Sequence, residues 1–278
     1  MPNFGYHLAR WQGNTVRRFY RALLPFIVRR RVQAPRPLDM DVFAYSSEET
    51  LPEQIASLRS FIRHAGRPRS FTIVSDGSHS ERSIRLLELA DPSVSVRGAN
   101  PAPAELPEKL RQYLATHPTG KQLALIMALP NSGPALYIDS DVLFFPGASD
   151  LVDRLAEQNV PAFYLADCQF AGDDRLLHDA AEKRNPANTG ALLLFRKLDW
   201  TASLGRFLEL KEEPTFFTNQ TITHLAMHEN AARPLDPAKY VLQLDDQFIF
   251  SDRYAGAALA LRHYVNPVRH KFWTSLSK

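Results

Sequence analysis

Hydrophobic residues along the chain fall into short continuous runs that alternate with segments of helical periodicity. Runs rich in β-branched and aromatic residues predict strands at 41–47, 70–77, 93–98, 134–145, 161–167 and 188–196. Apolar residues spaced three and four apart predict helices at 51–64, 80–90, 103–116, 120–129, 150–158, 200–210 and 219–230. The strands are apolar enough for burial on both faces. This alternation therefore indicates an α/β fold with a mostly parallel central sheet flanked by helices.

The first 37 residues differ from the rest in pattern and in charge. They contain eight arginines and no acidic residue, and their apolar positions recur at helical spacing up to Pro25, which would interrupt a helix. We predict a basic amphipathic arm at 1–37 and a single domain at 38–278. Two interpretations of the arm stay open. It either lies on an anionic membrane surface or packs on its own body with its arginines solvated.

Composition sets the broad class of protein. With 278 residues, 45% hydrophobic and 23% charged, the chain has ordinary globular values. No apolar run approaches the roughly 20 residues that span a bilayer, and the first residues lack the pattern of a signal peptide. Cys168 is the only cysteine, which excludes an intrachain disulfide. We expect a cytoplasmic protein, associated with a membrane only through the arm. The body after residue 37 is mildly acidic, so no nucleic-acid partner is expected.

Two carboxylates interrupt the apolar run "ALYIDSDVLFF" at 135–145. On a strand, Asp139 and Asp141 share one face, with Ser140 opposed. At the carboxyl end of a parallel strand they would lie at the edge where ligands bind in open α/β sheets. Neighbouring carboxylates repel unless a cation lies between them, and oxygen ligands suit Mg²⁺ or Mn²⁺. The alternative is a helix cap or a solvated turn.

An apolar strand followed by Asp-x-Asp, after several strand–helix units, resembles the metal-binding motif of glycosyltransferases with the GT-A fold. Three further segments resemble the retaining family that contains glycogenin and the bacterial galactosyltransferases (glycosyltransferase family 8-like). The resemblance implies a GT-A-type, Rossmann-like domain with Mn²⁺ or Mg²⁺ on Asp139 and Asp141. It implies a nucleotide-diphosphate sugar as donor, with UDP the commonest nucleotide. The acceptor would be a hydroxyl of a glycan, a lipid-linked molecule or a protein.

The segment "LRHYVNPVRHKFW" resembles the C-terminal motif of that family. The resemblance makes His263 the third metal ligand and Lys271 a contact of the donor diphosphate. The interval from His263 to Lys271 is two residues longer than in the family pattern. Arg269 or His270 is therefore the alternative phosphate contact.

Two other segments resemble the donor and catalytic motifs of the family. In "PANTGALLLF", Asn188 would bind the donor sugar and Gly190 would let the backbone approach closely. In "TNQTITHLAM", Gln220 matches the family pattern, but Asn219 stands where the family has Asp. Asn cannot act as a carboxylate nucleophile or base, which puts the catalytic role of this position in doubt.

The remaining donor contacts are placed by position along the predicted strands and helices. Lys121 opens the helix before the Asp-Ser-Asp strand and would hold donor phosphates or sugar, with plain solvation as the alternative. The other donor-site candidates are Ala44, Tyr45, Ser46, Asp76 and Ser140.

Other interpretations remain open at this stage. "YIDSDV" also fits haloacid-dehalogenase-like phosphohydrolases, in which Asp139 would be the nucleophile and Gly172-Asp173 a downstream pair. A non-catalytic nucleotide-sugar-binding protein is a further alternative. No residue stands out as the base of an inverting enzyme, with Asp245, Asp246 and Glu229 as candidates, which favours a retaining outcome. His224 and His228 lie four residues apart in a predicted helix but lack a zinc-binding pattern. They are interpreted as ordinary helix residues.

Overall fold

The computed structural model describes residues 3–99, 104–157, 159–276 and 278. Within these residues, the main sheet has seven strands in the order β3-β2-β1-β4-β7-β6-β8. Their bounds are β1 Pro37–Ser46, β2 Arg67–Ser75, β3 Val94–Gly98, β4 Ala135–Asp139, β6 Ala162–Ala166, β7 Ala187–Leu194 and β8 Arg233–Pro234. Strands β1 to β4 pair in parallel, whereas β7 runs antiparallel to both of its neighbours. The predicted α/β class with a mostly parallel sheet is confirmed.

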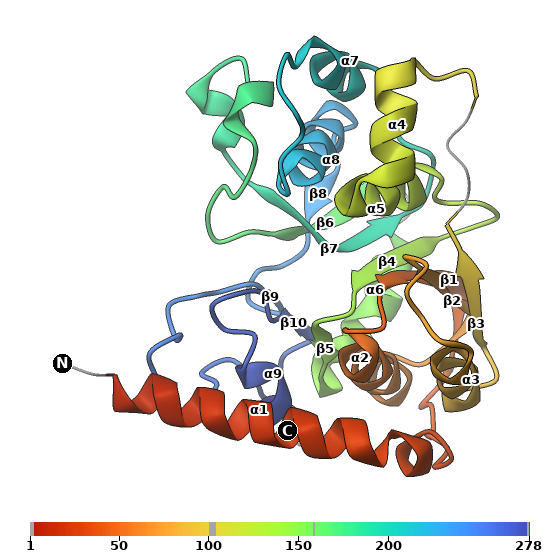
Figure 1. The fold of residues 1–278 in the computed structure, drawn as a ribbon, viewed down its shortest axis with the longest axis vertical. Helices are drawn as coiled ribbons and strands as arrows, with labels where there is room; N and C mark the ends of the chain where they lie inside the picture. The colour runs from red at the N-terminus through yellow and green to blue at the C-terminus, as the bar shows by residue number, and fades with distance from the viewer. Residues whose placement is uncertain (1–2, 100–103, 158, 277) are drawn as a thin grey trace.

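Helices cover both faces of the sheet (Figure 1). On one face lie α2 (Leu51–His64) and α3 (Glu81–Ala90), and on the other lie α4 (Glu108–Thr116), α5 (Pro118–Met127), α7 (Thr201–Glu209) and α8 (Thr218–Glu229). The side chains of β1 alternate between the two cores, with Val42 in one and Phe43 in the other, because successive strand residues point to opposite faces. The shorter elements are α6 (Asp150–Ala156) and the 3-10 helices η1 (Pro146–Ser149), η2 (Asp174–Leu176) and η3 (Ala180–Lys183).

The apolar run at 134–145 forms two strands, not the single strand that the sequence predicted. β4 ends at Asp139, the chain turns at Ser140 and Asp141, and β5 (Val142–Phe144) enters a second sheet of order β5-β10-β9. In that sheet β10 (Leu261–His263) pairs antiparallel with β5 and parallel with β9 (Tyr240–Val241). Because β4 ends at Asp139 and the turn follows at once, both carboxylates lie at the carboxyl end of this strand.

The N-terminal segment forms one helix, α1 (Phe4–Ile27), which continues through Pro25 and lies along one edge of the molecule (Figure 1). It packs on α9 (Lys271–Ser275) so closely that a side chain at Gly13 would overlap the backbone of His270. The rings of Tyr20 and Trp273 lie 5.0 Å apart. One face of α1 therefore packs on the body, as the second of the two interpretations of the arm expected. No helix within the described residues is both long and apolar enough to cross a membrane.

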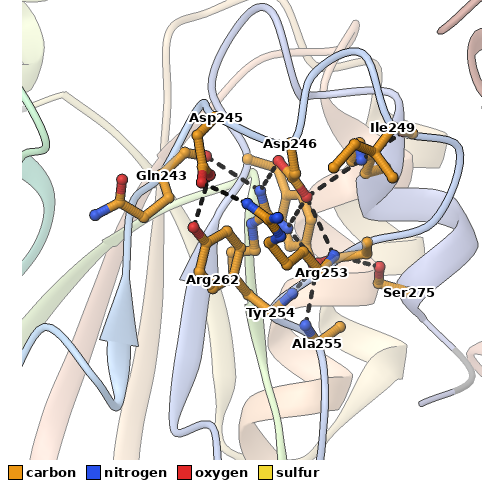
Figure 2. A network of polar contacts seen from close by, with 12 residues as sticks. Gln243, Asp245, Asp246, Ile249, Arg253, Tyr254, Ala255, Arg262 and Ser275 are labelled. Atoms are coloured by element: carbon orange, nitrogen blue, oxygen red, sulfur yellow. Dashed lines mark hydrogen bonds and ion pairs between the residues drawn. The ribbon is translucent and has the colours of Figure 1, made fainter.

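A buried ionic network holds β10 in place (Figure 2). The side chain of Arg262 is fully buried and pairs with Asp246 and Asp252, which are as deeply buried. Burial alone would raise the pKa of both carboxyls. The hydrogen bonds and charge of Arg262 outweigh it at Asp246, and the charge of Arg262 with hydrogen bonds from Ser275 and Tyr264 outweighs it at Asp252, so each pKa lies below the ordinary range. Since Arg262 and His263 are successive residues of a strand, anchoring one side chain fixes the direction of the other.

Candidate active site and metal centre

Three side chains from distant parts of the chain meet at the carboxyl end of β4. Asp139 ends this strand, Asp141 follows the turn, and His263 ends β10; one ligand atom from each lies within 4.8 Å of the others. Nε2 of His263 is 3.0 Å from a carboxylate oxygen of Asp141 and 3.6 Å from one of Asp139. The structure thus brings together the three residues that the sequence assigned to a metal.

Asn188 sets the orientation of His263. Its Nδ2 donates to Asp167 at 2.9 Å, and its Oδ1 accepts from the backbone N–H of Gly190 at 2.8 Å. The same Oδ1 is 3.0 Å from Nδ1 of His263, so that ring nitrogen carries the hydrogen. Burial acts to lower the pKa of His263, but the charges of Asp141 and Asp139 outweigh it and raise this pKa, so Nε2 also carries a hydrogen and donates it to Asp141. A bound cation would replace that hydrogen on Nε2. An imidazole oriented from behind in this way is the usual arrangement of a metal-binding histidine.

Hydrogen bonds from two neighbouring side chains fix Asp139. Its Oδ1 accepts from the hydroxyl of Tyr137 at 2.7 Å and from the side-chain amide of Gln122 at 2.9 Å. The other end of that amide accepts from Nδ2 of Asn219 at 2.9 Å, which ties α8 to the cluster. Tyr137 shares a strand face with Asp139 and could have been found by its i, i−2 spacing. Gln122 comes from α5 and had no detectable motif.

The electrostatics of the cluster fit a cation. Burial raises the pKa of Asp139, and the negative charge of Asp141 adds to that rise. Burial also acts to raise the pKa of Asp141, but the charges and hydrogen bonds of His263 and Arg269 outweigh it and hold this pKa well below its ordinary value. The two carboxylates therefore require positive charge beside them. With one imidazole and two carboxylates as donors, the residues present fit a divalent ion such as Mn²⁺ or Mg²⁺.

A cavity of about 600 Å³ opens beside the cluster, within the usual size range of ligand pockets. Ser140, Asp141 and Arg269 form one wall of the cavity, and α1 and the first turn of α2 form the others. The guanidinium of Arg269 bonds to Asp141 while half of its side chain stays exposed. Arg269 can therefore reach a ligand in the cavity without leaving the cluster.

The position of Lys271 argues against the predicted phosphate contact. Its side chain is fully buried, and its ammonium donates to the carbonyls of Ile249 and Ser251 and pairs with Asp246. All three donors are thereby used inside the ionic network of Figure 2, so the alternative Arg269 fits the phosphate contact better. Lys271 is the first residue of α9 and does not line the cavity.

The predicted donor-site residues of the first strands lie at the same sheet edge. Tyr45 pairs in register with Asp139, and its hydroxyl is buried with no hydrogen-bond partner among the described residues. Burial raises the pKa of Tyr45 to about 12. Ser46 is buried and accepts, through its backbone oxygen, from the N–H of Asp76, whereas Ala44 lies inside the core. The Tyr45 hydroxyl is therefore a buried polar group at this edge that the described residues leave unpaired.

Lys121 lies apart from the cluster cavity. Its ammonium is 3.4 Å from the backbone oxygen of Asp76, and it lines a separate cavity together with Arg97 and Lys197. Gln220 donates to the backbone of Ala171 at 2.7 Å and lies 3.4 Å from Asn188. A direct contact of Lys121, Asn188 or Gln220 with a donor sugar stays a prediction.

The alternative interpretations gain no support from the structure. Asp139 ends the fourth strand along the chain, whereas the phosphohydrolase alternative expects its nucleophile on the first. Asp173 is held by Arg175 and by Thr218. Asp246 is locked in the buried network, which removes it as a candidate base. His224 and His228 bond to backbone groups of 182–187, in agreement with their interpretation as ordinary helix residues.

Comparisons with known proteins identify the fold. No protein-family model matches the chain, and no curated protein matches it. The galactosyltransferase LgtC, solved with donor and acceptor sugar analogues, superposes with a TM-score of 0.56 at 13% identity, over 86% of this chain and 95% of that chain. Mouse xyloside xylosyltransferase 1 gives 0.53 at 12% identity, over 84% and 99%. GlyE of Streptococcus pneumoniae gives 0.55 at 16% identity, over 87% of this chain and 61% of that chain.

These similarities establish the class of fold that the chain adopts. It is the GT-A fold of glycosyltransferases, as the resemblance in the sequence implied. At such low identities the likeness concerns the fold, and the chemistry has to be argued from the residues of this chain.

Proposed function

We propose that the protein is a metal-dependent glycosyltransferase, which moves a sugar from a nucleotide-diphosphate donor to an acceptor hydroxyl. The observation that carries this proposal is the cluster of Asp139, Asp141 and His263, of which Asp141 lines a ligand-sized cavity. Its place on a GT-A fold supports sugar transfer over other metal chemistry. LgtC, which shares the fold, was solved with sugar donor and acceptor analogues.

The cluster and the side chains around it have separate roles in this proposal. A divalent cation bound there would offset the negative charge that develops on a departing diphosphate. Asp139, Asp141 and His263 would hold that ion, and Asn188 and Gln122 would keep the ligands oriented. Arg269 would contact the diphosphate, because it reaches the cavity and carries a permanent positive charge.

The proposal also covers the donor nucleotide, the acceptor and the stereochemical outcome. The unpaired hydroxyl of Tyr45 supports a contact with the base or ribose of a nucleotide, and UDP is the proposed nucleotide. The acceptor would be a hydroxyl of a glycan, a lipid-linked molecule or a protein. We propose a retaining outcome, with Gln220 and Asn219 near the reacting sugar. Asn219 holds Gln122 and supplies no carboxylate.

The test measures metal binding and donor turnover on the same protein. Mn²⁺ binding is followed by calorimetry, and release of nucleoside diphosphate is measured across a panel of UDP-sugars with and without Mn²⁺. Asp141→Asn should abolish Mn²⁺ binding and lower turnover by at least a hundredfold, because it removes a charged ligand. Asp39→Asn, at an exposed carboxylate paired with Arg69, is the matched control and should change neither.

Two outcomes would contradict the proposal. Equal turnover of Asp141→Asn and wild type would remove the metal mechanism. Binding of UDP with Mn²⁺, but no turnover of any sugar donor with or without acceptors, would favour a nucleotide-sugar-binding protein.

A further inference from the structure

Helix α1 has three distinct faces. At about 100° per residue, its buried and half-buried positions Ala9, Gly13, Tyr20 and Leu24 share the side that packs on the body. A second side carries large apolar residues that remain exposed in the folded protein. They are Phe4, Leu8, Trp11, Phe19, Leu23 and Phe26, with exposed fractions between 49% and 79%. We call these six residues the apolar stripe.

The apolar stripe is continuous along the whole helix. Its members fall within an arc of about 120°. The other positions in this arc are Gly5, Gln12, Thr15 and Ala22, of which only Gln12 has a long polar side chain. Soluble proteins rarely leave so many large apolar side chains exposed on one helix face without a partner for them. The stripe is therefore a surface that binds something, and the charge around it indicates what.

Positive charge runs beside the stripe. Arg10, Arg18 and Arg21 are exposed on the third side of the helix, and Arg29, Arg30 and Arg31 are exposed just beyond its end. No acidic residue precedes Asp39 in the sequence, so the helix itself carries no negative charge. A face that joins apolar and cationic side chains complements the acyl–headgroup boundary of an anionic bilayer.

A loop of the body extends the same surface. Phe248, Ile249 and Phe250 are exposed, and their loop lies against Gly5 at the border of the stripe, where a Cβ would be 3.2 Å from the backbone oxygen of Phe248. Figure 1 shows α1 along one edge of the molecule, with the body on one side of it. The other side of α1 is free to lie against a flat surface.

We propose that α1 docks the protein on an anionic membrane surface, with the apolar stripe and residues 248–250 inserted between the headgroups. The arginines beside the stripe would contact lipid phosphates. A second copy of this chain fits less well, because two such helices placed face to face would bring their arginines together with no acidic residue on α1 to pair them.

Tryptophan fluorescence of the full chain provides a direct test. Of the three tryptophans, Trp11 is 65% exposed whereas Trp200 and Trp273 are buried, so a change in emission on binding reports on α1. Titration with vesicles of phosphatidylcholine containing phosphatidylglycerol should shift the emission to the blue. Pure phosphatidylcholine vesicles should bind at least tenfold more weakly, and raised salt should weaken binding to the anionic vesicles.

Two variants, compared by co-sedimentation with vesicles, distinguish binding through the apolar stripe from non-specific hydrophobic binding. Leu8→Ser combined with Phe19→Ser should weaken binding to anionic vesicles by at least tenfold, since each side chain loses the gain from apolar burial. Leu89→Ser combined with Phe216→Ser removes exposed apolar side chains outside α1 and should leave binding unchanged. The replaced residues are all exposed, so each variant should fold.

Three results would overturn the proposal. They are equal binding by the stripe variant and wild type, equal binding to neutral and anionic vesicles, and no binding of wild type to either vesicle. Concentration-dependent dimers that the stripe variant abolishes would instead assign the stripe to a second copy of the chain. Sedimentation velocity in the absence of vesicles measures this.

Discussion

The absence of a side chain at position 190 makes room for the imidazole of His263. A Cβ at Gly190 would lie under 3.0 Å from two ring atoms of His263 and from the amide oxygen of Asn188. The glycine was expected to let a donor sugar approach closely. Its demonstrated neighbour is instead the imidazole that the sequence assigned to the metal.

We predict that Gly190→Ala displaces His263 and weakens Mn²⁺ binding by about 10–100-fold, the usual effect of disturbing a ligand through its surroundings. Calorimetry of the purified variant measures this. Gly205→Ala is the matched control, because a Cβ there meets no other atom within 4 Å. Unchanged Mn²⁺ affinity in Gly190→Ala, with intact folding, would contradict the assignment of His263 as a ligand.

Among single residues, the sequence identified those that are part of a recognisable motif. It missed those whose role depends only on contacts made in the folded protein. Asp139 and Asp141 follow an apolar strand, and this pattern is visible without a structure. Gln122 and Arg262 act through contacts with residues far away in sequence, and nothing in their neighbours indicates those partners. Lys271 shows the same limit, because its burial depends on how the last helix folds back.

At the scale of elements, β10 is a short strand that carries an ionisable side chain on each of its two faces. Arg262 enters the buried network of Figure 2, and His263 meets Asp139 and Asp141. Buried ion pairs are costly to break, because the remaining partner keeps an uncompensated charge. The network thus ties the stability of the second sheet to the geometry of the site.

Removing Arg262 should therefore be severe. We predict that Arg262→Met lowers the free energy of unfolding by about 3–5 kcal/mol, since Asp246 and Asp252 lose their partner in the interior. Arg253→Met, at an exposed ion pair with Asp245, should cost less than ~1 kcal/mol. Urea unfolding of both variants measures the difference. Similar losses for the two would show that the buried network does not stabilise the fold.

Most elements could be predicted from periodicity, because each buries a face that its own residues define. The split of the 134–145 run into β4 and β5 could not. Both halves are apolar, and only pairing with β10 moves the second half into another sheet. The apolar pattern predicts that a segment is buried, but it does not predict which sheet the segment joins.

At the scale of the whole molecule, α1 joins segments from both ends of the chain. Arg17 pairs with the largely buried carboxylate of Glu53 on α2, which also accepts from the indole N–H of Trp273 on α9. The sequence predicted an amphipathic, basic segment here. It left open whether that segment packs on the body or on a membrane. The structure gives the helix one packed face and one exposed face, so the two interpretations concern different sides of it.

We predict that Arg17→Met destabilises the protein by about 1–3 kcal/mol, because Glu53 loses a charged partner in a largely buried position. Arg18→Met, one residue along on an exposed side, should stay within ~0.5 kcal/mol of wild type. Thermal and urea unfolding compare the pair. Equal stability of the two variants would mean that α1 is held by its apolar contacts alone.

The packing of α1 on α9 orders events during synthesis of the protein. Gly13 and Tyr20 leave the ribosome long before His270 and Trp273, the residues that cover them. Asp141 likewise waits for His263, which belongs to the same late segment. Until that segment has been made, the part of α1 that packs on α9 has no partner there. One late segment thus supplies both the packing partner of α1 and the third member of the Asp139–Asp141–His263 cluster.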